Sequence, residues 1–137
     1  MKKFKIEVTF PGKLENIRKV SLGVRDLLQQ LLSSQEKFVQ DVELCLTEGL
    51  SNVMLHAHKT NQGKMIRFQI LIEDTELTIR IFDSGPGFVL DPKAIRLPKT
   101  HQNSGRGLFI ISQLMDDVLY QKNKGENYLE MKKSFEN

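Results

Sequence analysis

Residues 47–57, Thr-Glu-Gly-Leu-Ser-Asn-Val-Met-Leu-His-Ala, are the most informative stretch of the chain. Within it Glu48, Asn52 and His56 follow one another one helical turn apart, which places them on one line along an α-helix. The rest of the stretch is apolar nearly all round, as is typical of a buried helix. The same spacing would arise if these three residues simply formed the solvent-facing polar side of the helix. However, a carboxylate and a carboxamide one turn apart also suit magnesium, which prefers oxygen ligands.

The segments on either side of this stretch predict an alternation of strands and helices. Apolar residues at helical spacing predict helices over residues 14–32, 36–58 and 107–115. Alternating apolar residues predict strands over 4–10, 66–72 and 77–81, and two further strands over 117–121 and 128–133. The order strand, two helices, hairpin, loop, helix, hairpin predicts an α+β fold. In it, helices lie on one face of a mixed, mostly antiparallel sheet.

The composition indicates one globular domain spanning residues 1–137. The chain is 39% hydrophobic and 27% charged, which is typical of folded proteins. No apolar run approaches the roughly 20 residues that cross a bilayer, and the basic start lacks the apolar stretch of a secretory signal. Its one cysteine, Cys45, has no intramolecular partner. These features predict a cytoplasmic protein with no membrane contact.

Asp83 is the second unusual residue, because it shares the apolar face of its predicted strand. By parity it lies on the side of Leu77, Ile79 and Ile81, and a carboxylate there needs hydrogen-bond partners. It could cap the following turn through the backbone, as Asp before Gly often does. It could equally accept a hydrogen bond from the amino group of a ligand such as adenine.

Two glycine-rich segments provide candidate ligand contacts. Gly85 and Gly87 flank a proline and permit close approach of the backbone to a ligand, although a plain turn would use the same residues. Further along, the run Ser104-Gly105-Arg106-Gly107-Leu108 opens a predicted helix. Free N–H groups at a helix start bind phosphate well, and Arg106 adds a positive charge. The run matches neither a Walker loop nor a dinucleotide fingerprint.

Taken together, these three segments resemble the GHKL ATPases, the superfamily of gyrase, histidine kinases and MutL. The segment from Glu48 to Asn52 is similar to the N-box, and the runs beginning at Asp83 and Gly105 are similar to the two glycine boxes. The resemblance covers essentially the whole chain. It implies a single histidine-kinase-like ATPase domain with the two-layer α/β sandwich of the GHKL (Bergerat) type.

Within that superfamily the chain most resembles bacterial anti-sigma-factor serine/threonine kinases of the RsbW and SpoIIAB type. The small size, the run at residues 47–57 and the run Gly105-Arg106-Gly107-Leu108-Phe109-Ile110-Ile111 carry this likeness. It implies an ATP-binding protein kinase that phosphorylates an anti-anti-sigma antagonist on serine and also sequesters a sigma factor. A homodimer is implied as well. One departure is Val53, where the family often has alanine.

The resemblance also implies a role for each matched residue. Glu48 would be the general base for the acceptor serine, Asn52 would ligate Mg²⁺, and Asp83 would bind the adenine amino group. The remaining nucleotide-binding residues would be His56, Gly85, Gly87, Ser104, Gly105, Arg106, Gly107 and Leu108. Phosphoryl transfer depends mainly on placement and charge neutralisation, which such a set would supply.

Three other functions remain open or are disfavoured by the sequence. A non-catalytic module that uses ATP as a structural ligand or switch is compatible with every motif. A detached histidine-kinase catalytic domain is disfavoured, because no separate hairpin with an acceptor histidine is present. Direct binding of nucleic acid is also disfavoured. The net charge is only +3, and basic residues are scattered among nearly as many carboxylates.

Overall fold

The fold was described from a computed structural model, which defines residues 3–56, 64–83, 106–123 and 125–136. The elements in chain order are β1 (Lys3–Pro11), α1 (Leu14–Leu31), α2 (Glu36–His56), β2 (Met65–Glu73), β3 (Glu76–Asp83), α3 (Arg106–Leu114), β4 (Asp117–Gln121) and β5 (Asn127–Ser134). Every predicted helix and strand is present, and the ends differ from the predicted ones by at most two residues. None of the described helices is long and apolar enough to cross a membrane.

The strands form one sheet in the order β1-β2-β3-β5-β4. All of the pairings among the described strands are antiparallel, although we had expected a mixed sheet with a mostly antiparallel character. Strand β5 lies between β3 and β4. In the last hairpin, therefore, the second strand (β5) pairs with β3, and the first strand (β4) forms the edge of the sheet. The register pairs Asp83 at the end of β3 with Asn127 at the start of β5.

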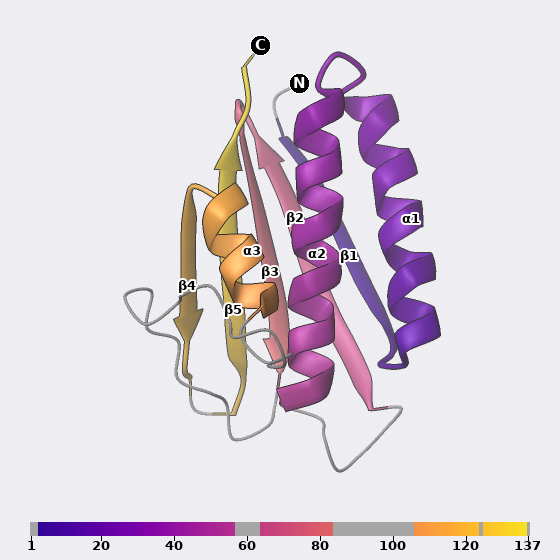
Figure 1. The fold of residues 1–137 in the computed structure, drawn as a ribbon, viewed down its shortest axis with the longest axis vertical. Helices are drawn as coiled ribbons and strands as arrows, with labels where there is room; N and C mark the ends of the chain where they lie inside the picture. Colours follow the sequence, from indigo (N-terminus) through magenta and orange to yellow (C-terminus); the bar gives the residue numbers. More distant parts are fainter. Residues whose placement is uncertain (1–2, 57–63, 84–105, 124, 137) are drawn as a thin grey trace.

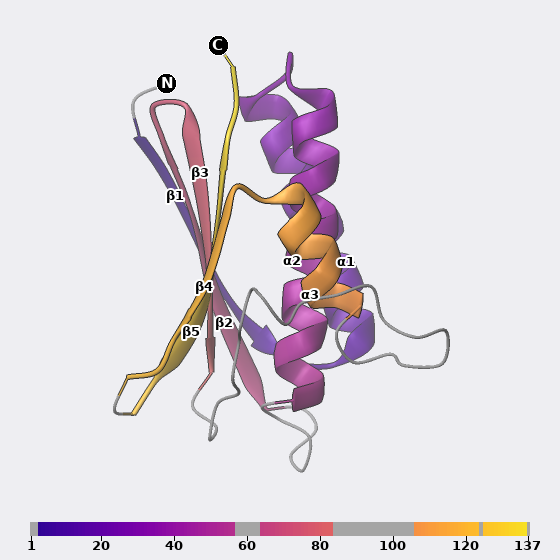
Figure 2. The ribbon, with the colours of Figure 1, turned by 60° about the vertical axis from the view of Figure 1, so that its left-hand side comes forward.

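All three helices cover the same face of the sheet, which confirms the predicted two-layer α+β architecture (Figures 1 and 2). Helix α2 is the central one, and it contacts α1 on one side and α3 on the other. Between the layers lie the buried apolar side chains of alternate strand positions, among them Ile70, Ile79 and Leu129. None of the described helices lies on the opposite face of the sheet.

Helix α2 lies unusually close to the sheet at Gly49. A Cβ atom placed on Gly49 would be 2.7 Å from Cδ1 of Ile81 and 3.1 Å from Cε of Met131. Glycine therefore lets the helix backbone approach β3 and β5 where a larger residue would hold it away. One turn earlier, burial and, to a smaller extent, the negative charge of Asp41 raise the pKa of the Cys45 thiol to about 12. The interface between α2 and the sheet is thus closely packed and dry.

Helix α3 is held against the core by its second half. Its buried Ile111 joins the core, and the backbone N–H of Met115 donates to the carbonyl of Ile111. Lys133 of β5 donates from Nζ to the carbonyl of Leu114, where the last carbonyls of the helix lack intrahelical partners. The core and β5 therefore fix the C-terminal half of α3.

The two helical glycines outside α3 provide a matched test of this packing. At Gly23, in the exposed middle of α1, no atom lies within 4 Å of an added Cβ. We expect Gly23→Ala to raise the free energy of unfolding by about 1 kcal/mol, because alanine has the higher helix propensity and constrains the unfolded chain.

We expect Gly49→Ala to lower the free energy of unfolding, because overpacking a core costs about 1–3 kcal/mol and outweighs the gain in propensity. Urea denaturation of both variants beside the wild type measures the difference. Equal stabilisation by the two substitutions would contradict the close approach of α2 to the sheet.

Candidate functional site

Four of the predicted site residues that the structure describes, Glu48, Asn52, Asp83 and Gly107, lie in the same half of the molecule, between the helix layer and the sheet. Figure 1 shows that α2 and β3 run in the same direction and both end in this half, and that α3 begins in it beside α2. Glu48 and Asn52 lie toward the end of α2, Asp83 ends β3, and Gly107 is in the first turn of α3. The fold thus brings together three segments that are far apart in the sequence.

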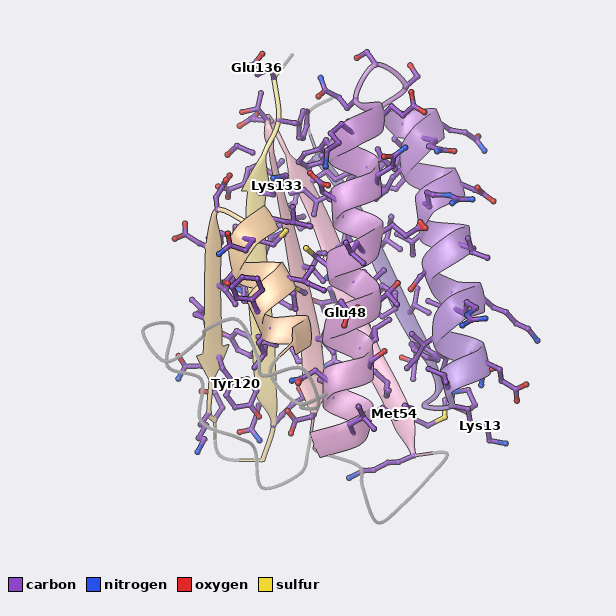
Figure 3. The ribbon with its side chains drawn as sticks, in the orientation of Figure 1. Lys13, Glu48, Met54, Tyr120, Lys133 and Glu136 are labelled. Atoms are coloured by element: carbon purple, nitrogen blue, oxygen red, sulfur yellow. The ribbon has the colours of Figure 1, made fainter. Side chains whose placement is uncertain are left out.

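Glu48 is in direct contact with the first turn of α3. A Cβ atom placed on Gly107 would lie 2.8 Å from Oε2 of Glu48 and 3.6 Å from its backbone oxygen. Glu48 is half-buried, and Figure 3 shows it on the part of α2 beside α3. The start of a helix carries free N–H groups and a partial positive charge. The glycine therefore lets a carboxylate sit beside a place suited to phosphate.

Asn52 is the residue of the N-box whose environment most clearly indicates a ligand. Its side chain is 6% exposed, and its Nδ2 has no hydrogen-bond partner among the described residues. A buried amide without a partner costs about 1–3 kcal/mol, so native structures rarely keep one. The amide oxygen suits magnesium and the amide nitrogen suits a phosphate oxygen, so the residue fits a Mg²⁺–nucleotide complex.

Magnesium bound here would take most of its ligands from outside the protein. No three His, Cys, Asp or Glu side chains in the described residues gather around one point in a way that could hold a metal ion. Mg²⁺ commonly keeps several waters and binds through one or two protein groups together with substrate phosphates. A single carboxamide such as that of Asn52 is compatible with this mode of binding.

Asp83 is 3% exposed and accepts hydrogen bonds from two side chains, one on the adjacent strand β5 and one on the more distant strand β4. The hydroxyl of Tyr120 donates to Oδ2 over 2.7 Å, and Nδ2 of Asn127 donates to Oδ1 over 3.2 Å. These bonds supply the partners that a buried carboxylate needs. Asp83 thus faces the helix layer as the sequence predicted.

The contact between Gly49 and Ile81 places Asp83 at the level of Asn52. Asn52 follows Gly49 by three residues in α2, and Asp83 follows Ile81 by two residues in β3. The corresponding rises are about 4.5 Å in a helix and about 6.8 Å in a strand, so the two chains advance by similar amounts. The Mg²⁺ candidate and the adenine candidate are therefore on adjacent elements at the same end of the core.

Several predicted site residues lie outside the described part of the chain, namely Gly85, Gly87, Ser104 and Gly105. The backbones of His56 and Arg106 are described, as the last residue of α2 and the first of α3, but their side chains are not. Leu108 is half-buried and packs against the core. For these residues, the roles in ligand binding stay predictions.

Sequence reasoning missed Tyr120 and Asn127. Both side chains lie on the apolar face of the sheet. Tyr120 pairs with the buried Leu129, and Asn127 precedes Leu129 by two residues in the same strand. The polar carboxamide of Asn127 at an apolar-face position was the one feature of the sequence that could have marked this cluster. Their contact with Asp83 depends on the strand order, which the sequence pattern did not provide.

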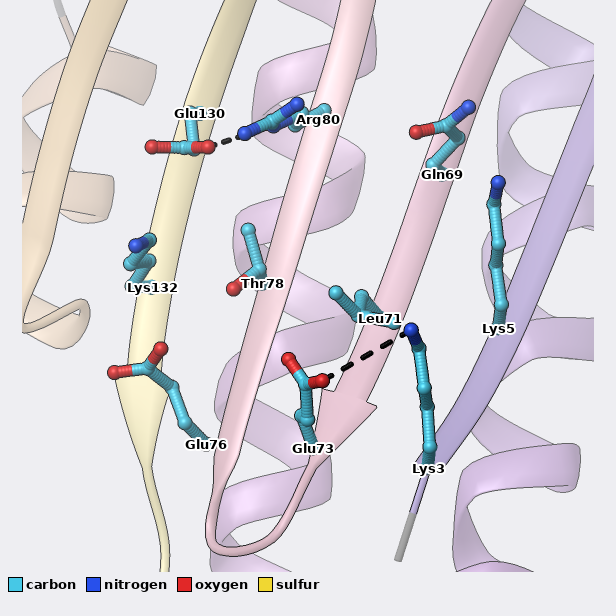
Figure 4. Close-up of a pocket in the computed structure, with 10 residues that line it drawn as sticks. All are labelled: Lys3, Lys5, Gln69, Leu71, Glu73, Glu76, Thr78, Arg80, Glu130 and Lys132. Carbon is cyan, nitrogen blue, oxygen red and sulfur yellow. Dashed lines mark hydrogen bonds and ion pairs between the residues drawn. The ribbon is translucent and has the colours of Figure 1, made fainter.

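A separate hollow lies on the helix-free face of the sheet and contains none of the predicted site residues (Figure 4). It has a volume of about 290 Å³ and is lined mainly by charged side chains from β1, β2, β3 and β5. Two ion pairs cross it, Lys3 with Glu73 at 3.9 Å and Arg80 with Glu130 at 2.6 Å. The described residues thus contain two distinct places with different chemistry.

The chain belongs to the histidine kinase-like ATPase domain family, whose profile matches residues 10–133. This match spans the three segments and the elements that carry them, and it confirms the resemblance on which the site was predicted.

Two bacterial proteins are similar to this chain over nearly its whole length. The anti-sigma F factor of Clostridium acetobutylicum is 29% identical over 136 residues, covering 96% of this chain and 94% of that protein. The serine-protein kinase RsbW of Bacillus mycoides is 28% identical over 138 residues, covering 94% of this chain and 85% of that protein.

Two solved structures share the fold. The RsbU and RsbW domains of Rv1364c from Mycobacterium tuberculosis match with a TM-score of 0.70 at 14% identity, over 96% of this chain and 32% of that one. The SiaB–SiaC complex of Pseudomonas aeruginosa matches with a TM-score of 0.62 at 13% identity, over 95% of this chain and 89% of that one.

Replacing Asn52 by leucine should separate stability from ligand binding. We expect Asn52→Leu to raise the free energy of unfolding of the nucleotide-free protein by about 1 kcal/mol, because it removes a buried donor that has no partner among the described residues. The same variant should lose the increase in melting temperature that Mg²⁺–ATP gives to the wild type. Thermal unfolding with and without Mg²⁺–ATP measures both effects.

Gln40→Leu is the matched control, because Gln40 is exposed on the same helix. It should keep the response to Mg²⁺–ATP. A normal response in Asn52→Leu would remove Asn52 from the nucleotide site.

Proposed function

We propose that this chain is an ATP-binding anti-sigma factor and serine/threonine protein kinase. It would phosphorylate an anti-anti-sigma antagonist on serine and, in another state, sequester a sigma factor. The relatives named anti-sigma F factor and serine-protein kinase RsbW support this proposal, since the likeness extends over almost the full length of each. The family membership supports ATP as the phosphoryl donor.

The observation that carries the kinase activity is the contact between Glu48 and Gly107. It places a half-buried carboxylate at the start of α3, where phosphate groups bind favourably. A general base must lie within hydrogen-bond reach of the proton that it accepts. A serine hydroxyl approaching phosphate at this helix start would come within reach of Glu48.

The other residues divide the work of binding in this proposal. Asn52 would hold Mg²⁺, which would supply neutralisation of the phosphate charge, and Asp83 would accept a hydrogen bond from the adenine amino group. Gly85 and Gly87 border the base. Phosphate is held by the remaining predicted residues near the start of α3, namely Ser104, Gly105, Arg106, Gly107 and Leu108, and His56 completes the nucleotide-binding set.

The reaction itself requires few covalent changes. The serine oxygen forms a bond to the γ-phosphorus while the bond between that phosphorus and the β,γ-bridging oxygen breaks, so ADP leaves. Glu48 takes the hydroxyl proton of the serine. Positioning and charge neutralisation account for most of the acceleration of such transfers.

Partner binding and location complete the proposal. Sigma factor and antagonist are proposed as protein partners, and the cytoplasm as the compartment, because the free Cys45 suits a reducing environment. No direct contact with nucleic acid or membrane is proposed.

Replacing Glu48 by glutamine should abolish catalysis without abolishing ATP binding. The amide has the shape of the carboxylate but does not accept the serine proton. We expect Glu48→Gln to transfer phosphate to the antagonist at least about 100-fold more slowly, while its Kd for ATP stays close to that of the wild type. Transfer of γ-labelled phosphate to a purified candidate antagonist measures the rate.

Glu36→Gln makes the same chemical change at an exposed position in the first turn of α2 and should leave the transfer rate unchanged. Wild-type transfer by Glu48→Gln would exclude Glu48 as the base. If the wild type binds ATP tightly but transfers phosphate to no candidate, a non-catalytic ATP-dependent regulatory module becomes the better assignment.

A homodimer is also proposed, with the helix-free sheet face as its surface. That face carries both charge signs around the hollow, including Lys5, Glu76 and Lys132, as a two-fold interface between identical surfaces allows. Light scattering should give twice the monomer mass, and Thr78→Arg at the centre of the face should shift the mass toward the monomer (Figure 4). A monomeric wild type would contradict the dimer but not the kinase.

A further inference from the structure

The carboxylate of Asp83 is held through both of its oxygens by side chains from two other strands. Tyr120 of β4 donates its hydroxyl to Oδ2 at 2.7 Å, and Asn127 of β5 donates Nδ2 to Oδ1 at 3.2 Å. Asp83 and Asn127 are 3% and 6% exposed, so both belong to the buried layer of the sheet. The Tyr120–Asp83–Asn127 cluster is therefore built into the core beside the proposed nucleotide site.

The reach of Tyr120 is unusual within this sheet. Strand β5 separates β4 from β3, so a side chain on β4 must cross two interstrand spacings, about 9.5 Å in all, to meet Asp83. A tyrosine with its terminal hydroxyl is long enough to do so, and Figure 3 shows Tyr120 near the end of the sheet where the site residues gather. Asn127 needs no such reach because it is the register partner of Asp83.

Two bonds from different strands fix the orientation of the carboxylate. The terminal torsion of an aspartate side chain is broadly distributed, so an unsupported carboxylate rotates. Here a rotation would stretch the bond to Tyr120, the bond to Asn127, or both. Both groups donate a hydrogen, so the carboxylate acts as an acceptor toward them, and it offers about four acceptor positions in all.

We propose that Tyr120 and Asn127 are positioning residues that set the base selectivity of the site, through Asp83, in favour of purines with a 6-amino group. This inference rests on the proposed nucleotide-binding function. A fixed acceptor binds an amino group well, and it gains nothing from a purine that lacks that group. Loss of the hydrogen bond from Tyr120 or from Asn127 gives the carboxylate more freedom to rotate. The preference for purines with a 6-amino group then falls.

A purely structural role of the cluster predicts a different result. If Tyr120 and Asn127 only tied β4 and β5 to β3, their loss would loosen the site for every purine nucleotide by the same factor. The informative quantity is therefore the ratio of two affinities measured on one preparation. A reduced folded fraction leaves that ratio unchanged.

The test compares ATP with purine riboside triphosphate, which lacks the 6-amino group, by calorimetry in the presence of Mg²⁺. We expect Tyr120→Phe to weaken ATP binding about ten-fold while the affinity for the analogue changes little, so that the selectivity ratio falls by the same factor. Asn127→Ala should lower the ratio in the same direction.

Tyr128→Phe is the matched control. The chain has only two tyrosines, and Tyr128 lies on the opposite face of the sheet, where Arg80 stacks over its ring at 4.9 Å. Removal of its hydroxyl should change neither affinity. Because the ring is kept in both variants, the comparison isolates a single hydroxyl on each face.

The outcomes distinguish this inference from the function on which it rests. If Tyr120→Phe keeps the wild-type ratio, or weakens both ligands equally, the positioning role is wrong while ATP binding stands. If the wild type fails to distinguish the two ligands, or Asp83→Asn leaves the ratio unchanged, the assignment of Asp83 to the adenine amino group fails and the inference fails with it.

Discussion

The close approach of helix α2 to the sheet at Gly49 is the constraint on which the rest of the structure depends. Without a side chain there, the helix backbone lies directly on Ile81 and Met131. This approach sets the separation of the two layers, and Glu48 and Asn52 flank the contact on the same helix. A residue with a Cβ at this position would displace both side chains relative to β3, because protein interiors have little free volume.

Three of the five buried polar or charged side chains in the described part of the chain lie toward one end of the two-layer core. Along most of its length the interface between helices and sheet is apolar, with Leu46, Ile70 and Ile79 fully buried. At the end where α2 and β3 finish, Asn52, Asp83 and Asn127 are buried as well. Buried polar groups stabilise a fold only when fully satisfied, and Nδ2 of Asn52 has no partner among the described residues. The buried amide of Asn52 thus lowers the stability of the ligand-free protein at the place where the proposed ligand would bind.

The topology explains why segments distant in the sequence meet. Helix α3 starts beside the second half of α2, and its first turn touches Glu48. Strand β5 is inserted between β3 and β4, which brings Asn127 and Tyr120 to Asp83. A single end of a two-layer fold therefore carries a carboxylate beside a helix start, a buried carboxamide, and a second carboxylate fixed by two donors.

The sequence by itself determined the helices and strands, because the periodicity of apolar residues follows directly from helix and strand geometry. It also marked Glu48, Asn52 and Asp83, since polar groups on apolar faces stand out in such patterns. Only the tertiary structure decided that Gly107 touches Glu48, that Gly49 sets the layer separation, and that Tyr120 and Asn127 hold Asp83. These contacts depend on strand order, register and the close approach of backbones. Such features arise from the packing of the whole chain, so no local pattern of residues encodes them.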